Sequence, residues 1–122
     1  MPIVDIEIVC TREDALRLPP AQALADVAGR ILGTPEGRTW VRLRTLEASH
    51  YAENETAVRA DERPVFVTVL HAHPPGDAER AAEVLALTRA VAMTLGHRED
   101  RVHVQYAPAA AGRQAFGGRL VE

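Results

Sequence analysis

Hydrophobic and polar residues follow two different periods along this chain, and the two periods recur in the same order in each half. Short runs rich in β-branched residues predict strands at residues 2–9, 40–46, 64–71 and 102–106. Apolar residues recur at helical spacing over 20–32 and 77–95, which predicts two helices. Asp77 is the expected N-cap of the second helix, and Gly33 and Gly96 follow the first and the second helix. The pattern predicts a β-α-β unit that occurs twice: an α/β (α+β) fold with a four-stranded mixed sheet and two helices on one face.

The third strand carries an expectation about assembly. Its side chains alternate between two faces, with Val65, Val67 and Val69 on one and Phe66, Thr68 and Leu70 on the other. Both faces of this strand are therefore largely apolar. Because two helices cover only one face of a four-stranded sheet, we expect the second face to be buried between copies of the chain in a homo-oligomer.

Composition limits the classes of protein to which the chain can belong. With 122 residues there is room for one core, so we expect a single domain over 1–122 with pseudo-repeats at about 2–47 and 64–107. A formal net charge of −3, with acids and bases interspersed, argues against nucleic acid as a partner. Asp5 and Glu7 interrupt the apolar stretch that a signal peptide needs, and Cys10 is the only cysteine. We therefore expect a cytoplasmic protein with no membrane association, and Cys10 buried at the end of its strand.

Pro2 is the first candidate for chemistry, because it directly follows the initiator methionine and opens the first strand. A small second residue favours removal of Met1, which would leave a free secondary amine at one end of the sheet. Such an amine can carry a proton to and from a substrate. The alternative is structural: a proline that starts a strand gives up an N–H that the ladder does not need.

Several segments resemble the tautomerase superfamily, whose members have an amino-terminal proline, duplicated β-α-β units and a trimeric assembly. The resemblance rests on Pro2, on Ile8-Val9-Cys10-Thr11-Arg12, on 100–106 (Asp-Arg-Val-His-Val-Gln-Tyr) and on Ala115-Phe116-Gly117-Gly118. It covers nearly the whole chain except residues 48–63. It implies a trimeric tautomerase-like fold that works without a cofactor.

The resemblance also implies roles for individual residues. Arg12 takes the position of an arginine that binds a substrate carboxylate, and His73 takes the same position in the second half. His103 and Gln105 match positions that line the pocket of a neighbouring subunit, and Phe116 matches an apolar pocket wall. For Arg12 and Phe116 the structural alternatives are a solvated charge and an ordinary core residue.

A second catalytic arginine of the short tautomerases lies on the strand that follows the first helix. Arg42 takes this position after a two-residue slip, and without the slip Trp40 does. Trp40, Arg42 and Arg44 alternate onto one face, so the pocket receives a basic or aromatic residue in either register. The alternative for the two arginines is a structural ion pair.

The implied activity is keto–enol interconversion of a small 2-oxo or 2-hydroxy-enoic carboxylic acid. Pro2 would take the hydroxyl proton and return it to carbon, while arginines hold the carboxylate and keep the amine neutral.

His71 and His73 share a spacing that metals use, but no third ligand is recognisable, so we expect no metal. Two alternatives stay open. One is hydration, dehalogenation or decarboxylation assisted by Glu47 or Glu53, and the other is a non-catalytic trimeric binding protein.

Overall fold

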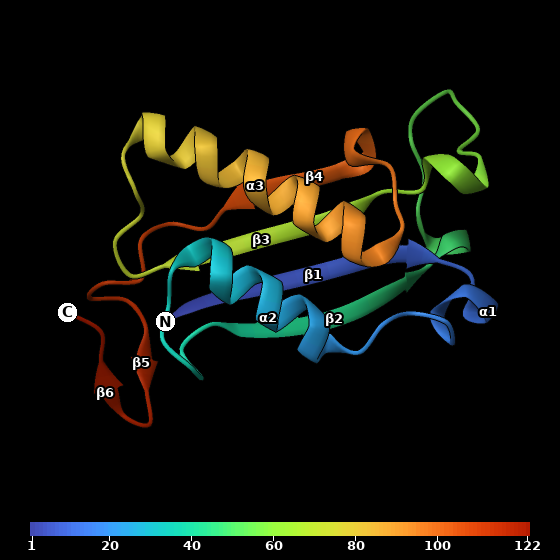
Figure 1. Ribbon diagram of the computed structural model, residues 1–122. Coiled ribbons are helices and arrows are strands. Elements are labelled where there is room, and N and C mark those ends of the chain that lie inside the picture. The colour runs from blue at the N-terminus through green and yellow to red at the C-terminus, as the bar shows by residue number, and fades with distance from the viewer.

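A computed structural model describes all residues from 1 to 122, and its centre is a sheet with two long helices across one face (Figure 1). The four strands are β1 (Pro2–Cys10), β2 (Trp40–Glu47), β3 (Val65–His71) and β4 (Val102–Tyr106). They lie in the order β2-β1-β3-β4, with β1 parallel to β2 and β3 parallel to β4. β1 and β3 meet antiparallel at the centre. The predicted duplicated β-α-β arrangement and mixed sheet are confirmed.

The two long helices, α2 (Ala21–Leu32) and α3 (Asp77–Leu95), lie side by side over the sheet (Figure 1). Each ends as predicted at a glycine with a left-handed backbone, at φ 65° for Gly33 and 64° for Gly96. The predicted cap of α3 is wrong by one residue, because Gly76 occupies the capping position and Asp77 is the first helical residue. No helix is apolar enough over a membrane-spanning length to cross a lipid bilayer.

The remaining elements are short. Thr11 caps a helix of one turn, α1 (Arg12–Ala15), by accepting a hydrogen bond from the Asp14 amide at 3.1 Å. Three 3₁₀ turns and a C-terminal hairpin complete the chain: η1 (Ala48–His50), η2 (Ala60–Glu62), η3 (Glu99–Arg101), β5 (Ala115–Phe116) and β6 (Arg119–Leu120).

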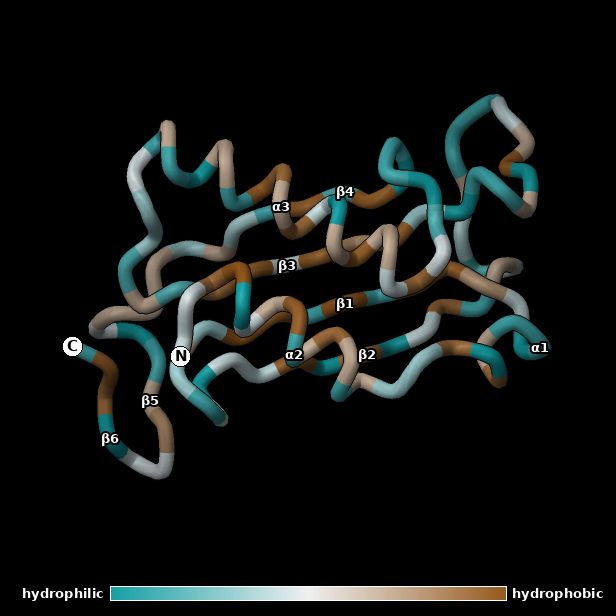
Figure 2. Tube along the Cα trace, in the orientation of Figure 1, coloured by the Kyte–Doolittle hydropathy of each residue, from teal (hydrophilic) through white to brown (hydrophobic).

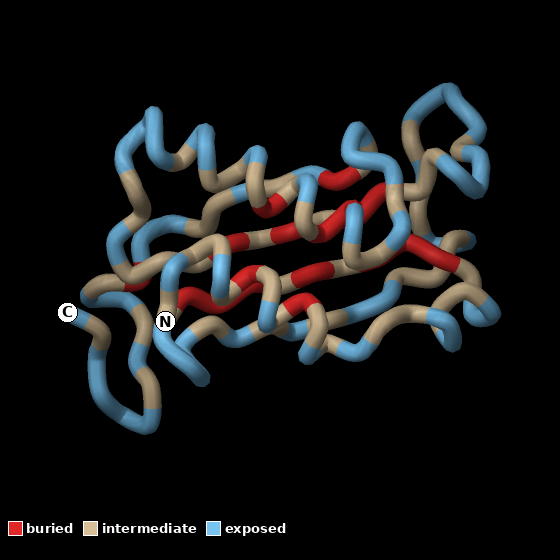
Figure 3. Tube along the Cα trace, in the orientation of Figure 1, coloured by how far each residue is buried: buried red, intermediate tan, exposed pale blue.

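The hydrophobic core lies between the sheet and the two helices. Buried residues follow β1 and β3 and the inner sides of the helices, while β2 and the loops are more exposed (Figure 3). Leu24 of α2 and Leu87 of α3 are almost fully enclosed, as is Ile6 at the centre of β1. Cys10 is buried at the end of β1, as predicted.

The opposite face of the sheet collects residues from all four strands. β3 is apolar over most of its length, but the neighbouring strands alternate with hydrophilic residues (Figure 2). The residues of the open face at mid-sheet are mostly polar or charged: Asp5, Glu7, Arg42, Arg44, Thr68 and Gln105. Apolar residues such as Ile3, Phe66 and Leu70 share this face, so it is mixed in character, and β3 itself is largely apolar on both faces as predicted.

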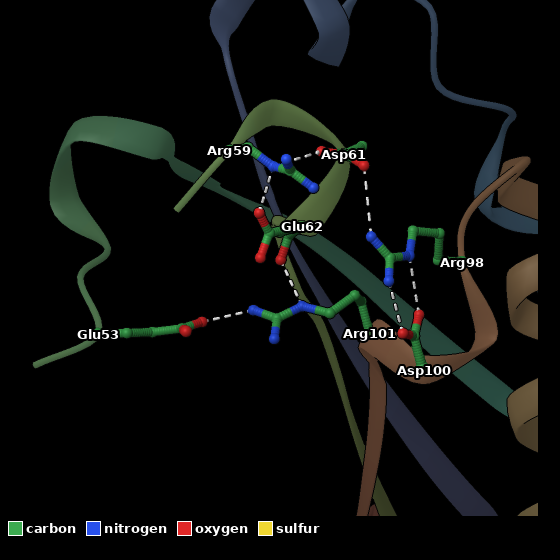
Figure 4. A network of polar contacts seen from close by, with 7 residues as sticks. All are labelled: Glu53, Arg59, Asp61, Glu62, Arg98, Asp100 and Arg101. Atoms are coloured by element: carbon green, nitrogen blue, oxygen red, sulfur yellow. Dashed lines mark hydrogen bonds and ion pairs between the residues drawn. The ribbon is translucent and has the colours of Figure 1, made fainter. Parts of the chain in front are cut away.

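An ion-pair network anchors the segment between β2 and β3 to the turn before β4 (Figure 4). Arg101 contacts the Glu53 carboxylate and the Glu62 carbonyl, and Arg98 reaches Asp61 at 3.3 Å and Asp100 at 2.7 Å. The Arg98 hydrogen bond holds the pKa of Asp100 below its usual value. Most of these groups are exposed, so each pair contributes little on its own, and the network acts by linking distant segments.

Candidate active site

Pro2 begins β1 at the end of the sheet where the C-terminal hairpin lies (Figure 1). It is fully buried and lies directly opposite His71 of β3. The Val9 amide donates to the Pro64 carbonyl at 3.1 Å, which makes that pair a hydrogen-bonded one in the ladder. Hydrogen-bonded and non-bonded pairs alternate, so Pro2 and His71, seven positions further, form a non-bonded pair. The nitrogen of Pro2 is therefore directed away from β3, toward the side on which β2 begins.

An aromatic pair lies on that side of Pro2. Trp40 is the first residue of β2 and is paired with Ile3. Its ring meets the ring of Phe116 edge-on, with 4.8 Å between centroids, and its indole N–H donates to the Gly37 carbonyl at 2.9 Å. The two rings form an apolar wall that joins the C-terminal hairpin to the Pro2 end of the sheet.

A polar cluster lies on the other side of Pro2, between the sheet and α3. His71 Nε2 is 2.9 Å from a carboxylate oxygen of Glu83, and Tyr106 donates its hydroxyl hydrogen to the same oxygen. The rings of His71 and Tyr106 stack with 5.9 Å between centroids. Only 13% of the His71 side chain and 14% of the Glu83 side chain are exposed. This cluster puts a largely buried carboxylate on the face that Pro2 shares with His71.

His73 lies just beyond β3 at the same end of the sheet. It is exposed, and its Nε2 donates to the carbonyl of Glu122 at 2.8 Å. His71 and His73 therefore bond to different groups, and no three His, Cys, Asp or Glu side chains are grouped so that they could hold a metal ion.

Four of the predicted site residues lie on the open face of the sheet: Arg42, Arg44 and Gln105 at mid-sheet, and His103 nearer the end away from Pro2. Arg42 is paired with Asp5 in the register and holds its carboxylate with two hydrogen bonds, Nε to Oδ1 at 2.5 Å and a terminal nitrogen to Oδ2 at 2.7 Å. These bonds hold the pKa of Asp5 below its usual value. Arg44 lies one pleat further from Pro2, and Gln105 donates to Thr68 at 2.8 Å.

Arg12 and His103 lie toward the opposite end of the sheet from Pro2. Pro2 and Cys10 mark the two ends of β1, which at about 3.3 Å per residue are about 26 Å apart. Arg12 follows that far end and lines an open hollow of about 390 Å³ together with Glu47. His103 is paired with Phe66 in the register, and their rings are 5.8 Å apart. One chain therefore does not bring Arg12 and Pro2 to the same site.

The carboxylates considered for water activation also lie away from Pro2. Glu47 is the last residue of β2 and accepts a hydrogen bond from Ser49. Glu53 is held by Tyr51 and Arg101, whose hydrogen bonds lower its pKa. Within one chain, neither can act on a substrate held at Pro2.

Sequence reasoning missed the carboxylate near Pro2. His71 was considered only as half of a metal-binding pair, and neither Glu83 nor Tyr106 was a candidate for any site. The signal was the antiparallel pairing of β1 with β3, because it sets His71 opposite Pro2. Glu83 comes from α3, and no motif in the sequence connects it to either strand.

The environment of Tyr106 leads to a testable expectation. Burial, together with the hydrogen bond and charge of Glu83, raises the pKa of Tyr106, because these factors disfavour the phenolate. The resulting stability is present below the ordinary tyrosine pKa near 10 and is lost as the pH rises toward the folded-state value. In a spectrophotometric titration Tyr106 should ionise well above pH 10, and Tyr106→Phe should remove that step. A normal titration midpoint for this residue would contradict the cluster.

Comparison with known proteins bears on the fold of the whole chain. No family model matches the sequence, and no curated protein matches it. Among solved structures, macrophage migration inhibitory factor from Oncomelania hupensis matches with a TM-score of 0.74 at 18% identity, over 100% of this chain and 83% of the other. A fused wild-type 4-OT, a symmetric trimer, matches with a TM-score of 0.73 at 20% identity, over 98% and 94%. Pt0534 inactivated by 2-oxo-3-pentynoate matches with a TM-score of 0.68 at 19% identity, over 98% and 94%. The chain thus has the fold of the tautomerase superfamily, which the amino-terminal residues and the duplicated pattern predicted.

Proposed function

We propose that this protein, after removal of Met1, is a tautomerase that uses the Pro2 amine to interconvert the keto and enol forms of a small 2-oxo or 2-hydroxy-enoic carboxylic acid. The observation that carries the proposal is the position of Pro2. It starts a central strand, and its nitrogen is free of the β1–β3 ladder and directed toward the Trp40–Phe116 wall. A proline that only started a strand would need neither a nitrogen directed away from the ladder nor an aromatic wall beside it.

The chemistry requires one group that acts first as a base and then as an acid. A neutral Pro2 amine takes the hydroxyl proton of the enol and becomes an ammonium. The electron pair of the O–H bond forms the carbonyl. The electrons of the carbon–carbon double bond then form a new C–H bond with the proton that the ammonium gives up. The amine must be neutral near pH 7 to begin this cycle. Burial favours the neutral form of an amine, and Pro2 is fully buried.

The substrate carboxylate needs a cation, and we propose that Arg12 of a neighbouring copy provides it. Arg12 is exposed at the end of the sheet opposite to Pro2, so the two can share a site only across a subunit interface. A homotrimer with this arrangement is supported by the symmetric trimer of the similar 4-OT. His103 and Gln105, on the open face, would reach the same neighbouring site, with His73 at the Pro2 end as a further contact.

Arg42 and Arg44 are proposed for the same carboxylate or for the developing enolate. Arg42 would have to exchange the Asp5 carboxylate for that of the substrate, whereas no ion pair engages Arg44. The Trp40–Phe116 wall favours an enol that carries an aromatic or apolar group over a purely dianionic one.

The experiment is a kinetic assay on purified protein whose mass shows that Met1 is absent. Phenylenolpyruvate should be ketonised faster than the uncatalysed rate, with a higher kcat/KM than 2-hydroxymuconate, and light scattering should give a mass near that of three chains. Lack of turnover of both enols by a protein that begins at Pro2 would favour a non-catalytic binding protein. Release of carbon dioxide or halide from unsaturated acids would instead favour the decarboxylase or dehalogenase alternative.

A further inference from the structure

Glu83 contacts the residue that is paired with the proposed catalyst, and the proposed reaction gives it no role. Building on the proposed function, we infer that Glu83 is a positioning residue that, through His71, sets the charge of the Pro2 amine. A nearby carboxylate favours the ammonium, so it would strengthen Pro2 as the base that takes the enol proton. The inference rests on a cluster that three different elements bring together beside Pro2.

The geometry connects Glu83 to Pro2 through His71. Pro2 and His71 are a non-bonded pair of the ladder, the type in which the Cα atoms approach to about 4.5 Å and the side chains are closest. His71 in turn contacts Glu83 at 2.9 Å, and Tyr106 donates to the same carboxylate oxygen. An ionised carboxylate only accepts, so His71 Nε2 carries the hydrogen of this bond. Two donors therefore hold the carboxylate in one orientation, and one of them is the residue paired with Pro2.

Two opposing influences set the pKa of the Pro2 amine. Burial of Pro2 disfavours the ammonium, while a carboxylate in the same partly buried layer favours it. Burial alone would weaken the amine as a base, and the carboxylate opposes that loss. With Glu83 neutralised, only burial would remain, and the amine would lose its proton at lower pH.

Other titratable groups near the cluster come from α3 and from the end of β3. Arg80 of α3 is close enough to lower the proton affinity of Tyr106, but its own hydrogen bond is to Asp77, which is 98% exposed. His73 lies beyond the end of β3 and bonds to the backbone of Glu122. Glu83 is therefore the one partly buried acid of this group.

The test measures the amine directly. Protein labelled with ¹⁵N-proline and co-expressed with methionine aminopeptidase is titrated by NMR, in which Pro2 is the only proline with a titrating nitrogen. Glu83→Gln should shift the Pro2 midpoint to lower pH by about half a pH unit or more. Glu79→Gln is the matched control, since it removes the same charge from an exposed position one turn earlier on α3. Tyr106→Phe keeps the charge and should leave the midpoint within about 0.2 units of the wild type.

Each outcome decides the question. A shift in Glu83→Gln alone, with the acidic limb of kcat/KM moving the same way, supports the inference. Equal midpoints in Glu83→Gln and wild type, or equal shifts in Glu83→Gln and Glu79→Gln, overturn it, as does an equally large shift in Tyr106→Phe. Failure of the proposed function is a separate result, because absence of enol turnover in the wild type leaves the titration of the amine fully measurable.

Discussion

Replacing Pro2 with alanine should lower kcat/KM for enol ketonisation by about 100-fold, the low end of the range for loss of a general acid–base group. Methionine is also removed before alanine, so the variant keeps an amine at the same position in the chain. That amine is primary, and it lacks the ring that packs opposite His71 and fixes the direction of the nitrogen. The loss of activity should therefore appear mainly in kcat, measured by stopped-flow mixing of the enol with protein of verified mass.

The control for this variant is a second buried proline. Pro64 precedes β3, its carbonyl accepts from the Val9 amide, and its nitrogen is part of a peptide bond. Pro64→Ala should keep most of the activity at a temperature at which both variants remain folded. Full activity in Pro2→Ala would remove the basis for an amine catalyst.

Replacing Arg12 with alanine should lower kcat/KM by about 10- to 100-fold, mostly through KM. This is the loss expected when a charge-assisted hydrogen bond to a carboxylate is removed, about 1.5 to 3 kcal/mol. Arg17 is the matched control, because it is exposed close to Arg12 and its ion pair is with Glu13. Arg17→Ala should leave both kinetic constants unchanged within about twofold.

Mixed assemblies test whether the site is shared between chains. If Pro2 of one chain works with Arg12 of its neighbour, an equal mixture of Pro2→Ala and Arg12→Ala chains, unfolded and reassembled together, regains wild-type sites. In a cyclic trimer about a quarter of the sites would carry both native residues. Activity no higher than the mean of the two parent variants would show that Arg12 serves no neighbouring site.

The architecture was accessible from the sequence because periodicity reports on local geometry. The helix-spaced stripe that ends at Gly33 and the one that ends at Gly96 fix two helices, and strand-like runs on either side of each fix the β-α-β order. The mixed character of the open face could not be predicted from β3 alone, because a sheet face collects residues from four strands. Asp5 and Arg42, for example, are far apart in the sequence and form an ion pair on this face.

The candidate site was accessible only in part. Resemblance supplied Pro2 and residue types for carboxylate binding, but it did not reveal that β1, with nine residues, separates Pro2 from Arg12 by its full length. The pairing of Pro2 with His71 depends on the antiparallel register of β1 and β3, and the approach of Glu83 depends on how α3 packs. Such contacts between elements leave no local pattern.

The proposed catalysis requires a reactive amine at Pro2, and covalent labelling measures this amine directly. An acetylenic 2-oxo acid such as 2-oxo-3-pentynoate offers a carbon to which a neutral amine adds; a C–N bond forms, and the neighbouring carbon takes up the proton. Loss of activity should run in parallel with the gain of one probe mass per chain, and peptide mass spectrometry should locate the adduct on Pro2, with the buried Cys10 unmodified. Inactivation with Pro2 unmodified, or a chain in which Met1 still blocks Pro2 and the enol is nevertheless turned over, would contradict the account.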